Sequence, residues 1–383
     1  MNKKLMAVAV AGALAAPAVA LAQASNVQIY GRANLGIDSV SSTGATAGSA
    51  SDRKSRTRVF DSSSRLGVRG TEDLGRGLKA VFLMESGVNV DNGGTTGQHG
   101  GANSSTGTLA SREAYVGLAG NWGQVTFGKQ NVWWTNLNDQ TQANYINVGT
   151  PYGTGTFGRL GGPTTRTNDT MKYISPSMGG FTAFVSYAPG SESAGGGADT
   201  NASIQGLTLT YRGPVIAQLD TATRKGATGV PARLDNSSTK LGLGWPYAPG
   251  ALLSVIFIRV ENSGGTAGGI AAASDNLTQN GWQLNWTHMW GNVQGMAQYG
   301  RIGQISGCTV GANCNNTGSN AWLVGVKYHL SKRTGIYASY TEVNNESNQY
   351  TDYYGGAMGV TAPGTSAAGA DPKIFALGIQ HNF

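Results

Sequence analysis

The last eleven residues, Lys373–Phe383, read KIFALGIQHNF and alternate between two rows of side chains. One row holds Phe375, Leu377, Ile379, His381 and Phe383, and the other holds Ile374, Ala376, Gly378, Gln380 and Asn382. A helix would instead gather Phe375, Gly378, Ile379 and Asn382, which is a poorer stripe. The segment therefore predicts a β-strand, and its length is that of a strand crossing a bilayer.

The same period of two recurs upstream in residues 27–38, 78–85 and 281–290. In each segment an apolar row, expected to face lipid, alternates with a row expected to face a lumen. The lumen rows are Gln28, Tyr30, Arg32, Asn34 and Asp38 in the first segment, Lys79 and Glu85 in the second, and Gln283, Asn285 and Thr287 in the third. One segment alone would be weak evidence, so the prediction depends on the repetition.

Short turns alternate with long polar loops along the chain. The short turns are expected at 71–76, 120–123, 175–179, 213–214, 248–250, 291–292 and 331–332. The long loops are expected at 39–57, 91–110, 131–165, 189–203, 225–237, 262–277, 306–318 and 345–370. These connections predict sixteen antiparallel strands, which must close into a barrel because a free edge in hydrocarbon cannot be satisfied. A transmembrane β-barrel of this size leaves an aqueous channel, with periplasmic turns, extracellular loops and both chain ends in the periplasm.

The first residues have the form of a secretory signal. Lys3 and Lys4 precede the apolar run 5–15, and small residues then fit cleavage after Ala22 or Ala24. We therefore expect residues 1–24 to be a signal peptide and 25–383 to be one barrel domain of an exported protein.

Composition is consistent with an exported barrel but does not decide the fold. Only 12% of residues are charged, about half the usual share, and no later stretch approaches the ~20 apolar residues of a spanning helix. The formal net charge is +7, which indicates either ordinary scatter or a positive bias in a pore. The chain has no basic run typical of nucleic-acid binding.

Several segments resemble the general porins of β-proteobacteria, which are trimeric sixteen-stranded barrels of the outer membrane. The segments are SNVQIYG (25–31), SSRLGVRGTEDLGRGLKAVFLMESG (63–87), SREAYVGLAGNWGQVTFGKQ (111–130), RTNDTMKYISPSMGGFTAFVSY (166–187), YHLSKRTGIYASY (328–340) and the final HNF. The resemblance implies a homotrimer in contact with outer-membrane lipid and lipopolysaccharide, which passes ions and small hydrophilic solutes. It also implies that the barrel-assembly machinery recognises the terminal Phe383, and that the third long loop, 131–165, folds into the barrel and narrows it.

Alternation places several charged side chains in the lumen: Arg32, Arg65, Lys79, Glu85, Arg166 and Lys172. The resemblance implies a constriction with a basic cluster of Arg65, Arg112 and Arg166, together with Arg32 and Lys79, facing the acids Glu85 and Asp139. Arg112 fits poorly, because alternation with Ala114 turns it outward unless a strand end or a bulge lets it turn in. Three arginines against two acids predict a mild preference for anions.

Other functions have less support. Cys308 and Cys314 are the only cysteines, and in an oxidising compartment they predict one loop disulfide. The stretch GTGTFG (153–158) lacks the strand-to-helix context of a dinucleotide site, and the four histidines are scattered, so we expect no enzyme, cofactor or metal. A substrate-specific channel stays open because Trp133, Trp134, Tyr145 and Tyr152 could form an aromatic track. An exported adhesin is disfavoured because the chain has no fixed short repeat.

Overall fold

The computed structural model describes most of the chain from Asn26 onward. The described residues are 26–62, 64–88, 90–91, 109–132, 156–157, 160–161, 166–189, 203–225, 235–263, 266–267, 270–271, 276–308, 314–352 and 367–383. The expected signal peptide, Asp139 and the aromatic residues Trp133, Trp134, Tyr145 and Tyr152 lie outside these residues. In the described part of the chain, no helix is both long and apolar enough to span a membrane.

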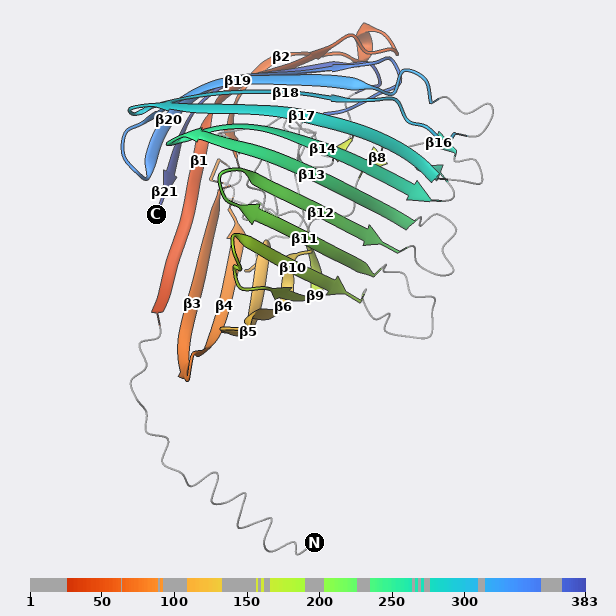
Figure 1. Cartoon of the computed structure of the whole chain (residues 1–383). Coiled ribbons are helices and arrows are strands. Elements are labelled where there is room, and N and C mark those ends of the chain that lie inside the picture. The colour runs from red at the N-terminus through yellow and green to blue at the C-terminus, as the bar shows by residue number, and fades with distance from the viewer. Residues whose placement is uncertain are drawn as a thin grey trace, which may run out of the picture.

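One large antiparallel sheet dominates the structure (Figure 1). Its strands are β1 (Asn26–Thr43), β2 (Arg53–Asp61), β3 (Arg65–Gly75), β4 (Leu78–Gly87), β5 (Glu113–Gly120), β6 (Gly123–Asn131), β9 (Arg166–Ile174), β10 (Phe181–Ala188), β11 (Ile204–Arg212), β12 (Ile216–Arg224), β13 (Asp235–Ala248), β14 (Ala251–Ser263), β17 (Asn276–Trp290), β18 (Val293–Ile302), β19 (Ser319–His329), β20 (Thr334–Asn345) and β21 (Asp371–Asn382). Outside the sheet are the 3-10 turn η1 (Ser49–Ser51) and two small hairpins, β7 (Thr156–Phe157) with β8 (Leu160–Gly161) and β15 (Thr266–Ala267) with β16 (Ile270–Ala271).

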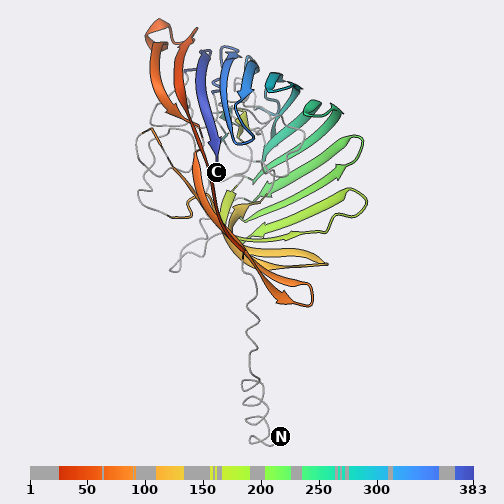
Figure 2. The ribbon, with the colours of Figure 1, turned by 90° about the vertical axis from the view of Figure 1, so that its left-hand side faces the viewer.

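The sheet closes into a barrel of sixteen positions. Both β2 and β3 pair with β1, at its second and first half respectively, so together they fill one position that is interrupted at 62–64. Neighbours in sequence then pair around the ring until β21 returns to β1, from Arg32↔Asn382 to Thr43↔Asp371. Figure 2 shows the strands fanning around this ring. The predicted fold class, an antiparallel sixteen-stranded barrel, is confirmed.

The short connections lie close to their predicted positions, but the first long loop is much shorter than expected. Alternation predicts a loop at residues 39–57, whereas β1 continues to Thr43 and β2 begins at Arg53. The outward side chains here are polar, and the Ser39 and Ser55 hydroxyls lie 3.1 Å apart. A barrel strand that continues beyond the hydrocarbon layer meets water on its outer face, so it needs no apolar row there. Apolar alternation therefore underestimates strand length.

The outer face carries an apolar band between two aromatic belts. On β17 the outward row runs Trp282, Leu284, Trp286, His288 and Trp290. Trp282 and Trp290 are ~26 Å apart along a strand, comparable to the ~25 Å apolar band of outer-membrane barrels. His288 lies between its neighbours, with ring centroids 6.4 Å from Trp286 and 4.6 Å from Trp290. His288 therefore belongs to the outward aromatic row.

The inner face is polar in places but not everywhere, which corrects the expected pattern. Gln283 and Asn285 face inward as predicted, and the Asn285 amide donates to Ser254 (3.2 Å). Near the ends of the strands that carry the long loops, however, inward residues of β14 and its neighbours form an apolar cluster. It includes Ile256, Ile258, Val260, Leu277, Leu323, Val343 and Ile374. Leu160 of β8 joins this cluster with no exposed surface, so here the wall meets protein and not water.

Candidate functional site

Glu85 is the centre of a charged cluster on the inner wall. It belongs to the inward row of β4, and its carboxylate accepts from Arg112 Nε at 2.6 Å and from the Tyr30 hydroxyl at 3.0 Å. The guanidinium of Arg65, on the neighbouring β3, lies 3.9 Å from the same carboxylate. Residues of two strands, β1 and β3, and one residue that precedes β5 thus converge on a single acid of β4.

Arg112 enters the lumen because it precedes β5 and escapes the alternation of that strand. Its backbone N–H donates to the Glu85 carbonyl at 2.9 Å, and its side chain is only 4% exposed. Glu113 follows as the first residue of β5 and lies opposite Glu85. Its carboxylate accepts from the backbone and side-chain amides of Asn131 at 3.1 and 2.6 Å. Both residues therefore face inward at this point.

Arg32 extends the basic side of the cluster. It lies opposite Arg65 across the β1–β3 pair, and its Nη2 donates to the Ser62 carbonyl at 3.2 Å. That carbonyl is available because the strand is interrupted between β2 and β3. Arg65 and Arg112 are near enough to repel Arg32 electrostatically, while Asp61 attracts it, so three guanidinium groups gather on one wall with acids among them.

Arg166 and Lys79, two further predicted site residues, lie apart from Glu85. Arg166 opens β9 opposite Asn131 and so shares its inner face, two strands from Glu113. Lys79 is in the inward row of β4, but it is six residues from Glu85 and is exposed near the short turn. Among the residues whose placement is described, Lys79 forms no ion pair. The basic cluster thus consists of Arg32, Arg65 and Arg112, with Arg166 at its margin.

A second ion pair, not anticipated from the sequence, lies across the ring. Lys240 on β13 is 3.4 Å from Asp220 on β12, and both side chains are almost completely buried. Thr208 on β11 and Gln218 donate to the same carboxylate at 2.5 and 2.7 Å. Each of these residues is in the inward row of its strand, which alternation would have revealed. The pairing itself depends on the register between strands, where Asp220 lies opposite Lys240.

The beginning of the third long loop lies against the inner wall. The Ser186 hydroxyl of β10 donates to the Val132 carbonyl, and Lys172 Nζ donates to the Asn131 carbonyl at 2.9 Å. A side-chain carbon added to Gly206 of β11 would lie 1.9 Å from the Val132 carbonyl oxygen. Glycine is therefore required at this close approach. Leu160 is buried further along the same loop, in the apolar cluster, where β8 contacts β14.

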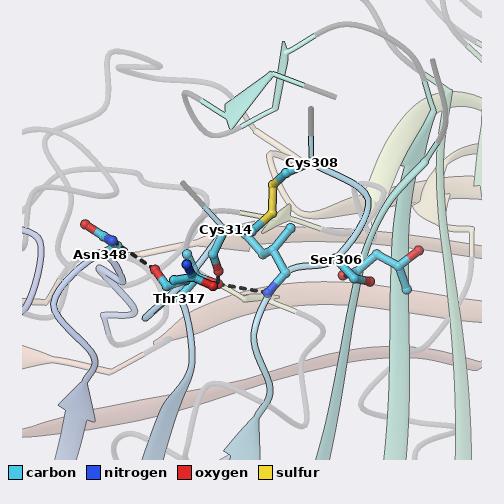
Figure 3. Close-up of a disulfide and its surroundings, with 8 residues drawn as sticks. Ser306, Cys308, Cys314, Thr317 and Asn348 are labelled. Carbon is cyan, nitrogen blue, oxygen red and sulfur yellow. Dashed lines mark hydrogen bonds between the residues drawn. A yellow bond between two sulfur atoms is a disulfide. The ribbon is translucent and has the colours of Figure 1, made fainter. Parts of the chain in front are cut away.

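The two cysteines are joined in a disulfide on the seventh long connection (Figure 3). Thr317 lies beside it: its hydroxyl donates to the Cys314 carbonyl at 2.7 Å and accepts from the Ile305 amide at 2.8 Å. Both cysteines pack against the apolar cluster of the inner wall. The disulfide therefore fastens this connection to the barrel and takes no part in the charged cluster.

Comparison with known proteins relates this barrel to the porins. A family model described as Gram-negative porin matches residues 7–349. Outer membrane porin protein 32 of Delftia acidovorans is 28% identical over the full length of both chains, and major outer membrane protein P.IB of Neisseria gonorrhoeae is 25% identical over 88% of this chain and 92% of its own. Among solved structures, an anion-selective porin from Comamonas acidovorans aligns with a TM-score of 0.70 at 23% identity, covering 94% of this chain and 100% of that one. OmpT of Vibrio cholerae in its trimer form aligns with a TM-score of 0.64 at 16% identity, with the same coverage.

Proposed function

The chain belongs to the Gram-negative porin family, and from that premise we propose that it forms a water-filled outer-membrane channel with a mild preference for anions. The observation that carries the proposal is the arginine cluster around Glu85. Inward charges at a narrow point set the ionic preference of a pore. The similar porins of Delftia and Comamonas are described as an outer-membrane porin and as anion-selective, respectively.

The preference is tested by the reversal potential in a planar bilayer. With a roughly tenfold KCl gradient, the reversal potential is expected to have the sign of the chloride equilibrium potential. Its magnitude should be below the ~59 mV limit of perfect selectivity. The physical reason is that chloride is attracted to the excess of guanidinium charge while potassium is repelled. A potential of the opposite sign contradicts anion preference but leaves the channel intact. An absence of conductance contradicts the channel itself.

We further propose that the third long loop, 131–165, narrows the pore. The contacts of Val132 with β10 and β11 and the burial of Leu160 beside β14 support this, because they fix two points of the loop on the inner wall. The proposed constriction would then lie between the loop and the charged wall formed by Arg32, Arg65, Arg112 and Arg166, with Glu85, Lys79 and Asp139 as further charges along the path.

Replacing residues 133–155 with a short Gly-Ser linker is expected to raise single-channel conductance severalfold, because the cross-section would widen. Replacing residues 353–366 of the eighth long connection with the same linker serves as the control, and we expect a smaller change there. Equal conductance of the loop-three variant and the unmodified protein would contradict the proposal.

The assembly and export of the chain are also proposals. We infer a cleaved signal peptide ending at Ala22 or Ala24 and a homotrimer, in line with the trimer form of the similar Vibrio protein. Phe383 is suited to recognition by the barrel-assembly machinery, since its backbone pairs with Gly31 at 3.0 and 3.1 Å while its ring remains exposed on the outer face. Contact with lipopolysaccharide follows from the outer-membrane location.

A further inference from the structure

We propose that the outer face of β18–β20 holds a binding site for the phosphorylated sugar headgroup of an outer-leaflet glycolipid. The proposal rests on the outer-membrane location proposed above and names a site within it. Its core is a cross-strand row of three outward residues, in which Arg301 lies opposite Asn320 and Asn320 lies opposite Asn344. Figure 1 shows their strands side by side.

The three residues line a shallow polar hollow of about 250 Å³, together with Ser319, Asn345 and Glu346. Neighbouring strands are ~4.8 Å apart, so the row of three spans ~10 Å, which is wide enough to take a sugar ring together with a phosphate substituent. The Asn344 amide donates to Asn320 Oδ1 at 3.2 Å, which orients both amides. The hollow therefore presents a fixed set of donors and acceptors.

The hollow lies at the level of the membrane where lipid headgroups are found. Aromatic rings of the upper belt border the lower edge of the hollow. Tyr299 and Trp322 are the next outward residues below Arg301 and Asn320, and Trp282 lies opposite Arg301. On β20, Glu342, which pairs with Lys373, comes between Asn344 and Tyr340. Trp282 and Tyr299 have ring centroids 5.6 Å apart, and Trp322 and Tyr340 are 5.0 Å apart. Aromatic belts mark the boundary between hydrocarbon and headgroups. A ligand in the hollow would thus place its acyl chains along the apolar band below.

Arg301 supplies the charge for a phosphate. Two other outward cations near this rim are already neutralised, since Arg259 pairs with Glu261 at 2.5 Å and Lys373 with Glu342 at 3.2 Å. Within the part of the chain that the structure describes, Arg301 has no such acidic partner, and its side chain is exposed. A guanidinium binds phosphate oxygens in a bidentate geometry.

Glu346 determines the orientation in which a phosphorylated sugar would bind. One oxygen of its carboxylate accepts from the Gly318 amide at 2.9 Å, and the acid would repel a phosphate placed next to it. Sugar hydroxyls, in contrast, can donate to a carboxylate. We therefore place the phosphate toward Arg301 and the sugar hydroxyls toward Glu346. A free phosphate would use only one end of the hollow, whereas a phosphorylated sugar would use both.

The test compares Arg301→Gln with Arg259→Gln, since both remove one exposed arginine from the same outer rim. The full-length protein is extracted in mild detergent, stripped of lipid and titrated with purified diphosphorylated lipopolysaccharide, with binding read by native mass spectrometry. Loss of a charge-assisted phosphate contact should weaken binding roughly tenfold in Arg301→Gln. Arg259→Gln should bind like the unmodified protein. Dephosphorylated lipopolysaccharide should bind the unmodified protein as weakly as the intact lipid binds Arg301→Gln, and inorganic phosphate should not compete.

Equal binding by Arg301→Gln and Arg259→Gln, equal binding of the dephosphorylated lipid, or competition by inorganic phosphate would each overturn the site. Conductance is recorded in parallel in phospholipid bilayers without glycolipid, where Arg301→Gln should match the unmodified protein. Normal conductance with no effect of Arg301→Gln on lipid binding overturns only the headgroup site. A complete lack of conductance in every sample instead overturns the proposed function.

Discussion

Replacing both Arg65 and Arg112 with glutamate is expected to reverse the ion preference of the pore from anions to cations. The two arginines flank Glu85 at 3.9 and 2.6 Å. Around this point Arg32, Arg65 and Arg112 meet the acids Glu85 and Glu113 and, beside Arg32, Asp61. The double substitution therefore makes the local net charge more negative by about four charges, which repels chloride and attracts potassium.

The reversal potential in a KCl gradient measures this effect. We expect a change of sign and a shift on the order of tens of millivolts toward the cation limit of ~59 mV. The matched control replaces Arg259 and Arg301 with glutamate, which alters the total charge equally but on the outer face. If control and test variants shift the potential equally, the preference arises from the overall charge of the protein and not from this cluster. If neither shifts it, the selective element lies elsewhere.

Glu85 and Arg65 could be predicted from the sequence because each lies within a strand whose apolar partners are visible. Met84 and Leu66 occupy the outward rows of β4 and β3, so their neighbours must face the lumen. Arg112 illustrates the limit of this argument. Its direction depends on where β5 begins, and the sequence leaves that boundary uncertain by more than one residue.

The inner apolar cluster could not be predicted from alternation at all. Ile256 and Ile258 face inward and alternate with the outward Val255 and Phe257, so residues 255–258 of β14 read as continuously apolar and the two faces look alike. Whether a face of the strand contacts water depends on what packs against it. Here Leu160, nearly a hundred residues earlier in the chain, packs against the inner face. Similarly, alternation gives the direction of Lys240 but not its partner, because the partner is set by strand register.

Asp220 and Lys240 lead to the largest expected effect on stability. Both side chains are almost completely buried on the inner wall, and the carboxylate also accepts from Thr208 and Gln218. Asp220→Asn keeps the shape of the side chain but leaves the Lys240 ammonium without its carboxylate. Removing one partner of a buried pair costs roughly 3–5 kcal/mol. The free energy of unfolding, measured by guanidinium denaturation of the refolded barrel in detergent, should fall by about that amount.

The double variant Asp220→Asn, Lys240→Met tests whether the lost stability comes from the attraction between Asp220 and Lys240. It removes the buried ammonium as well, so it should recover most of the lost stability, because an apolar side chain of similar volume replaces a charge that had lost its counter-ion. The exposed pair Lys225–Asp235, at 3.1 Å on the adjoining strands, is the matched control. There Asp235→Asn should change stability by less than ~1 kcal/mol, since water screens both charges. A double variant as unstable as the sum of its single variants would mean that Asp220 acts through Thr208 and Gln218, and that its attraction to Lys240 contributes little.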